Sequence, residues 1–142
     1  MARVNIGRVT QGGLLAGLVL NVVCILNQTL IVGKKLMEEQ QAGHFLSQPR
    51  FPFLPAWVIL MFLIGIALVW LYAAVRPRLG PGPRTALAIG FLVGVLSGVP
   101  DNLAAAAWGL SGRYLPFMWM VERIVGCTLA ALVGAWWYKE AE

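Results

Sequence analysis

"LPFMWMVERIVGCTLAALVGAWWY", residues 115–138, decides the fold class of this chain. A run of about 20 apolar residues is long enough, as a helix, to cross the hydrocarbon core of a bilayer. The only charged residues in this run are Glu122 and Arg123, which stand side by side. An ionised side chain within a membrane costs several kcal/mol unless partners compensate it. The run therefore predicts a transmembrane helix whose neighbours supply polar partners.

Three similar apolar runs precede this one. Of the 142 residues, 59% are apolar and only 12% are charged, whereas soluble domains carry about 25% charged residues. We therefore predict an all-α protein, a four-transmembrane-helix bundle that forms one integral membrane domain over residues 1–142. The predicted spans cover residues 9–32, 56–75, 85–110 and 115–138.

Prolines and charged residues shape the links between the spans. Thr85 to Val99 is too short to cross a membrane, so the third span is predicted to continue through a kink near Pro100. The alternative is that Asp101 caps a separate short helix. The link "RPRLGPGPR", residues 76–84, is predicted to be non-helical. The first helix can continue beyond the membrane through "GKKLMEEQQAG", residues 33–43, whose residues are good helix formers.

The lysines and arginines predict the orientation of the bundle. Arginines concentrate in the short second link, and cytoplasmic links are the ones enriched in basic residues. We expect the N- and C-termini to be cytoplasmic and the loop with His44 to face outward. The basic residues on the predicted cytoplasmic side are Arg3, Arg8, Arg76, Arg78, Arg84 and Lys139, and those on the other side are Lys34, Lys35, Arg50 and Arg113.

The N-terminal segment and the cysteines fit the same interpretation. Arg3 and Arg8 precede an apolar run as in a signal peptide, but no small-residue cleavage site follows. We expect this segment to remain as the first helix. Cys24 and Cys127 fall within predicted spans, which favours buried free thiols over a disulfide.

Polar residues of three predicted spans fall at one depth. At about 1.5 Å per helical residue, the polar residues of the third and fourth spans lie roughly 25 Å from the cytoplasmic side. In the first span, Asn27 and Gln28 lie near this level, and Asn21 lies somewhat deeper in the membrane. The second span contributes none. The predicted intramembrane polar cluster consists of Asn21, Asn27, Gln28, Asp101, Asn102, Glu122 and Arg123.

Small residues at a spacing of four mark the predicted contact faces, because they let helices approach closely in lipid. We expect the first, third and fourth helices to enclose the polar cluster, and the apolar second helix to face lipid or a partner. The predicted packing glycines are Gly13, Gly17, Gly90, Gly94, Gly98, Gly126 and Gly134.

Two roles are open for the polar cluster. In the first, Arg123 pairs with Asp101, Glu122 hydrogen-bonds an Asn or Gln of the first helix, and the cluster fixes helix register. In the second, the cluster binds an ion, a proton or a ligand. His44 is a weaker candidate, as a metal or pigment ligand. The sequence contains no phosphate loop, HExxH, CxxC or serine with a credible base, so we predict no catalytic residues.

Two segments, "WLYAAVRPRLGPGPRTA" (residues 70–86) and "GAWWYKE" (residues 134–140), resemble a group of small four-helix bacterial membrane proteins of uncharacterised function. The resemblance implies four spans in the bacterial cytoplasmic membrane and no catalytic residues. The chain is also similar in size and span count to small multidrug-resistance transporters. Those carry a glutamate in the first helix, whereas the only span glutamate here is Glu122, in the fourth.

The sequence favours a non-catalytic accessory or structural subunit of a larger membrane complex, for example an energy-transducing one. Its parts outside the spans are too small for an independent activity. We predict no intrinsic cofactor, and contacts with lipid or with pigments of the host complex. The net charge of +5 suits lipid head groups rather than nucleic acid. The alternative is a small proton-coupled transporter that acts as a homodimer around Asp101, Glu122 and Arg123, and a membrane enzyme is the third hypothesis.

Overall fold

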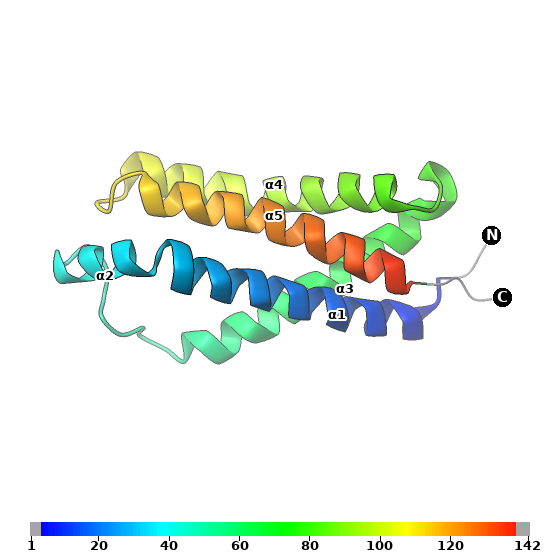
Figure 1. Cartoon of the computed structure of the whole chain (residues 1–142), viewed down its shortest axis with the longest axis horizontal. Coiled ribbons are helices and arrows are strands. Elements are labelled where there is room, and N and C mark those ends of the chain that lie inside the picture. The colour runs from blue at the N-terminus through cyan, green and yellow to red at the C-terminus, as the bar shows by residue number, and fades with distance from the viewer. Residues whose placement is uncertain (1–3, 139–142) are drawn as a thin grey trace.

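A computed structural model describes residues 4–138 as a bundle of helices (Figure 1). No strand occurs in that part of the chain. Four helices are long and apolar enough to cross a membrane, which confirms the all-helical prediction with four spans and indicates a multi-pass membrane protein. The helices are α1 (Ile6–Leu26), α2 (Gly33–Gln41), α3 (Phe53–Leu79), α4 (Pro83–Trp108) and α5 (Tyr114–Trp137), and a π-helical segment, η1 (Asn27–Ile31), continues α1.

The continuation of the first helix is not regular. At the end of η1 the amide of Val32 donates to the carbonyl of Asn27 at 2.9 Å, which is the wider hydrogen-bonding pattern of a π-helix. The Thr29 hydroxyl donates to the carbonyl of Ile25 at 2.7 Å. Beyond a bend at Val32, α2 begins as a separate helix.

The second link is shorter than the sequence predicts. The expectation that residues 76–84 are non-helical is wrong for six of the nine residues, because α3 continues through Pro77 to Leu79 and α4 already begins at Pro83. The amide of Gly80 closes this last turn by donating to the carbonyl of Arg76 at 2.9 Å. The helix α4 also runs without interruption through Pro100 and Asp101, so Asp101 does not begin a separate helix. The kink near Pro100 stays a prediction.

The helices α1 and α5 are the central pair, since α1 packs chiefly against α3 and α5 while α4 packs chiefly against α5. In Figure 1 the helices α1, α4 and α5 run nearly side by side, and α3 crosses them obliquely. The prediction that the first, third and fourth spans alone enclose the polar cluster is wrong. The second span, α3, packs along α1 and contributes buried residues such as Leu68 and Val69. It also keeps exposed apolar side chains such as Leu63, so that its outer face stays free for lipid or a partner.

Glycines bring α1 and α3 into contact. A Cβ atom added to Gly13 would lie 2.5 Å from the Cα of Ile66, and one added to Gly17 would lie 2.5 Å from the ring of Phe62. On the other side of this contact, a Cβ at Gly65 would lie 2.5 Å from the carbonyl oxygen of Gly13. These distances are too short for any side chain, so the contact requires glycine from both helices.

The other predicted glycines lie at contacts made by α5. Added Cβ atoms at Gly90 and Gly94 would lie 2.6 Å and 2.7 Å from the backbone of α5. A Cβ at Gly12 of α1 would lie 2.9 Å from the carbonyl oxygen of Gly134. Gly126 is less crowded, because its nearest neighbour in α1, Leu20, would be 3.3 Å away.

The two ends of the described chain meet at one end of the bundle, here called the terminal end. The amide of Asn5 donates to the hydroxyl of Tyr138 at 3.3 Å. The ring of Tyr138 packs edge-on against Tyr72 and lies 5.8 Å below the guanidinium carbon of Arg76. The opposite end, here called the loop end, carries α2 (Figure 1). Which end is cytoplasmic stays a prediction, and Arg3 and Lys139, which contribute to it, lie outside the described residues.

Candidate functional site

A groove of about 890 Å³ lies among the four long helices, in the half of the bundle near the loop end. Binding sites for small molecules commonly have volumes of about 300–1,000 Å³. Its walls are largely apolar, with Leu54, Val58 and Ile64 of α3 among them. Six residues of the predicted polar cluster also line this groove: Asn21, Gln28, Asp101, Asn102, Glu122 and Arg123.

The remaining member of the cluster, Asn27, holds Glu122 in place. Its side-chain amide donates to a carboxylate oxygen of Glu122 at 2.6 Å. This is the contact with the first helix that the sequence predicts. Asn27 is buried and is the first residue of η1. The hydrogen bond therefore joins the π-helical segment to α5 and satisfies one oxygen of a carboxylate that lies within a span.

Arg123 is held by aromatic and sulfur groups instead of an acid. Its guanidinium carbon lies 5.1 Å from the ring centroid of Trp57, and Nη1 donates to the sulfur of Met61 at 3.1 Å. A Cβ atom added to Gly98 would lie 2.7 Å from the Cβ of Arg123. Gly98 thus makes room for the stem of the arginine, and α3 receives its charged end.

The predicted ion pair between Arg123 and Asp101 is wrong. Within residues 4–138, no carboxylate oxygen lies within 4.0 Å of the Arg123 guanidinium. The two residues line the same groove, but the side chain of Arg123 turns toward the Trp57 ring of α3 and Asp101 is exposed. The depth estimate placed both residues at one level, and it carried no information about the direction of the side chains.

Two asparagines of the cluster bond to their own helices. The amide of Asn21 donates to the carbonyl of Gly17 at 2.9 Å, and that of Asn102 donates to the carbonyl of Gly98 at 2.7 Å. Each bond satisfies one amide hydrogen locally. The amide oxygens keep their capacity to accept from a molecule in the groove.

The α3 residues of the site are not among those that the sequence predicts. Trp57 and Met61 are four residues apart, so they share one face of a helix. Trp57 also donates its indole N–H to the sulfur of Cys24 at 3.2 Å. The signal that could have found this face is the tryptophan itself, because arginine packs preferentially over tryptophan rings.

The loop after α2 covers part of the groove wall. Phe45 packs edge-on against Trp119 with 6.1 Å between ring centroids, and Trp119 lines the groove.

His44, the residue before Phe45, is bonded to Glu39 of α2. Its Nδ1 atom lies 2.6 Å from one carboxylate oxygen of Glu39, and Lys35 Nζ lies 3.0 Å from the other. The hydrogen bond from His44, followed by that from Lys35, lowers the pKa of Glu39. His44 is therefore engaged in holding the loop, and within residues 4–138 no group of three or more potential metal-binding side chains occurs.

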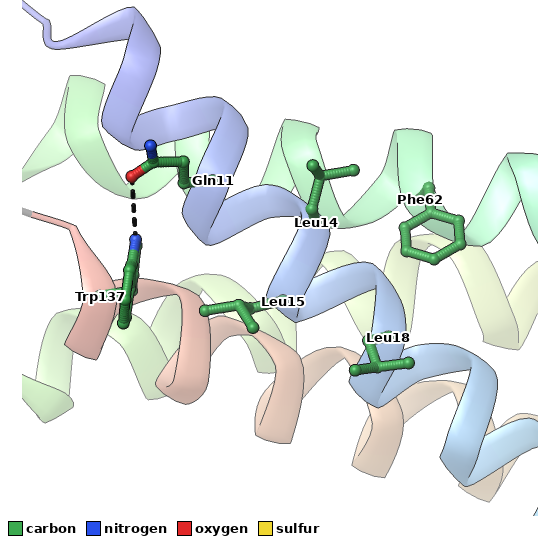
Figure 2. A pocket seen from close by; sticks show the side chains of 6 residues that line it. All are labelled: Gln11, Leu14, Leu15, Leu18, Phe62 and Trp137. Carbon is green, nitrogen blue, oxygen red and sulfur yellow. Dashed lines mark hydrogen bonds between the residues drawn. The ribbon is translucent and has the colours of Figure 1, made fainter.

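A second, shallower pocket of about 430 Å³ lies on the surface of α1 (Figure 2). Figure 2 shows Gln11 accepting a hydrogen bond from the indole N–H of Trp137 at 3.3 Å. The rest of the lining is apolar, with Leu14, Leu18 and Phe62 around it. This pocket contains no charged group, so we expect it to be covered by acyl chains.

Comparisons with protein-family models, with curated proteins and with solved structures find no match for this chain. The resemblance to small bacterial four-helix membrane proteins therefore stays an expectation.

Proposed function

We propose that this chain is a non-catalytic integral membrane protein that binds part of a lipidic molecule in the groove and serves as an accessory subunit of a larger membrane complex. The observation that carries the proposal is the charge of Arg123. This permanent cation lies within a span, and it has no acidic partner among the described residues. A charge within the membrane that has no counter-charge is unfavourable. The head of a membrane amphiphile offers the oxygen acceptors that this arginine lacks.

The distribution of apolar surface supports the role as a subunit. Exposed large side chains occur on every long helix, for example Leu18, Leu63, Leu96 and Phe117. In a membrane these faces contact lipid, other subunits or lipidic cofactors of the host complex. The described parts outside the four spans are α2 and short links, which supports an activity that depends on partners.

The test is purification of the chain in a mild detergent from the membranes in which it is made, followed by identification of what accompanies it. We expect larger membrane subunits in stoichiometric amounts, together with an extractable lipidic molecule. A lone homodimer without bound lipid would contradict the proposal.

The second candidate is the proton-coupled transporter, which is favoured by two carboxylates, Glu122 and Asp101, in one groove. A transporter needs a group that gains and loses a proton. Reconstitution in vesicles with an imposed pH gradient tests this hypothesis. Uptake that depends on the gradient and is lost in Glu122→Gln would favour it over the subunit.

A further inference from the structure

The groove contains charges of both signs that do not neutralise one another. Arg123 contributes a cation, and no acid of the described residues lies within 4.0 Å of it. Glu122 has one oxygen bonded by Asn27. Asp101 lines the same groove, is exposed, and makes no ion pair with a described residue. A molecule that fills the groove meets a cation and two anions.

This charge pattern discriminates between classes of occupant. A neutral molecule leaves the charges unsatisfied, which is unfavourable away from water. A simple anion satisfies Arg123 but is repelled by the carboxylates of Glu122 and Asp101. A head group with an anionic and a cationic end satisfies both signs at once.

The positions of Arg123 and Asp101 relative to α4 add a geometric argument. The stem of Arg123 packs against Gly98. Asp101 follows Gly98 by three residues, so it lies about one helical turn farther along α4. Asp101 and the stem of Arg123 thus border one section of the groove, and the guanidinium of Arg123 extends from there toward Trp57 of α3. Apolar residues of α3, including Leu54 and Ile64, line the same groove.

We propose that the groove binds a zwitterionic phospholipid whose head carries a phosphate and a primary ammonium, with the phosphate on Arg123 and the ammonium facing Asp101. The inference rests on the proposed function, because it specifies the lipidic molecule that the groove holds. Guanidinium groups bind phosphate by paired hydrogen bonds. A primary ammonium donates three hydrogen bonds to acceptors such as the Asp101 carboxylate. The acyl chains then lie along the apolar wall of α3.

The experiment compares additives in the thermal unfolding of the delipidated full chain in detergent. The additives are phosphatidylethanolamine, phosphatidylcholine, phosphatidylglycerol and soluble phosphoethanolamine. We expect phosphatidylethanolamine to raise Tm by about 5 °C at saturation. Phosphatidylcholine should act less, because its quaternary ammonium donates no hydrogen bond. If phosphatidylglycerol raised Tm equally, the claim that the head group must be zwitterionic would be overturned. If soluble phosphoethanolamine raised Tm equally, the claim that the ligand is a membrane lipid would be overturned.

Variants assign the two ends of the head group. Arg123→Gln should abolish the shift, and Asp101→Asn should reduce the effect of phosphatidylethanolamine to that of phosphatidylcholine. Arg113→Gln, an exposed arginine in the link after α4, is the matched control and should keep the full shift. If Arg123→Gln does not fold, Ser97→Phe provides the test of the site. Ser97 is an exposed residue that lines the groove, and a phenyl ring there should block the binding of the lipid. If phosphatidylethanolamine still raised the Tm of Ser97→Phe by the full amount, the assignment of the lipid to this groove would be overturned.

Failure of this inference and failure of the proposed function give different results. If no phospholipid shifts Tm but the chain still purifies with larger subunits and another lipidic molecule, only the head-group assignment is wrong. If the chain purifies alone and no lipid acts, both are wrong.

Discussion

The terminal end and the loop end of the bundle are built from the same four long helices, but the helices pack closely at the first and leave a groove at the second. Toward the terminal end, Gly12, Gly13 and Gly65 bring backbones together and leave no room for a side chain. Toward the loop end, α3 presents Trp57 and Met61 instead, and the space between the helices is a groove lined by charged and amide groups. The difference teaches that glycines let helices in lipid approach closely. Where α3 presents Trp57 and Met61 instead, the helices leave a groove, and the side chain of Arg123 extends toward these two residues.

The largest effect is expected from a bulky residue at the closed end. Gly65→Leu places a side chain where even a Cβ atom would lie 2.5 Å from the Gly13 carbonyl oxygen. We expect a loss of about 3 kcal/mol or more in the free energy of unfolding, because overpacking forces backbones apart. Thermal unfolding and size-exclusion chromatography in detergent measure this. The matched control is Ala67→Leu, at an exposed position of the same helix, and equal damage in both variants would contradict the close α1–α3 contact.

The next effect concerns the hydrogen bond between Asn27 and Glu122. Asn27→Ala leaves the Glu122 carboxylate without its donor, and we expect a loss of about 2 kcal/mol in the free energy of unfolding. Combined with Glu122→Gln, the loss should be smaller than the sum of the two single losses. Denaturation of the four proteins in detergent measures the coupling. Asn102→Ala, which removes a bond within one helix, serves as the control and should cost less.

A smaller effect separates the observed partner of Arg123 from the one that the sequence predicts. A double-mutant cycle of Arg123→Gln with Trp57→Leu should give a coupling of about 1 kcal/mol, the range of a partly buried cation–π contact. The same cycle with Asp101→Asn should give a coupling near zero, because no ion pair joins the two residues. If Arg123 coupled more strongly to Asp101 than to Trp57, the ion pair between Arg123 and Asp101 that the sequence predicts would be supported after all.

The smallest effect is a dependence on pH outside the spans. The pKa of Glu39 is lowered in the folded chain, first by His44 and then by Lys35. An acid whose pKa is lower in the folded than in the unfolded chain stabilises the fold at any pH above its unfolded pKa. That contribution is lost as the pH falls through the lowered pKa of the folded state. Hydrogen exchange of the α2 amides should therefore accelerate as the pH is lowered below about 4, after correction for the intrinsic pH dependence of exchange. Glu39→Gln should show fast exchange at neutral pH and no further acid step, while Glu38→Gln should behave like the parent protein.

Hydropathy was sufficient to predict the four helices, since an apolar run of this length has few alternatives to a membrane span. Counting residues along each helix brought Asp101 and Arg123 to one level, and both line the groove. Rotation about the helix axis and the role of α3 could not be predicted in the same way. An apolar helix shows no periodic difference between its faces, so the pattern of α3 did not indicate which neighbour Gly65 meets.

The π-helical segment has a consequence for how related chains should be aligned. One widened turn holds about one residue more than an α-helical turn, and each residue turns an α-helix by about 100°. Deletion of a single residue within Asn27–Ile31 would remove that extra residue and convert the segment into regular helix, so the residues that follow would keep their angular phase. A deletion in the regular part of α1 would instead rotate every later residue by about 100°. Glu39, and with it the loop that places Phe45 on Trp119, would then point in another direction. A gap within Asn27–Ile31 in an alignment is thus compatible with the same cover of the groove, whereas a gap elsewhere in α1 is not.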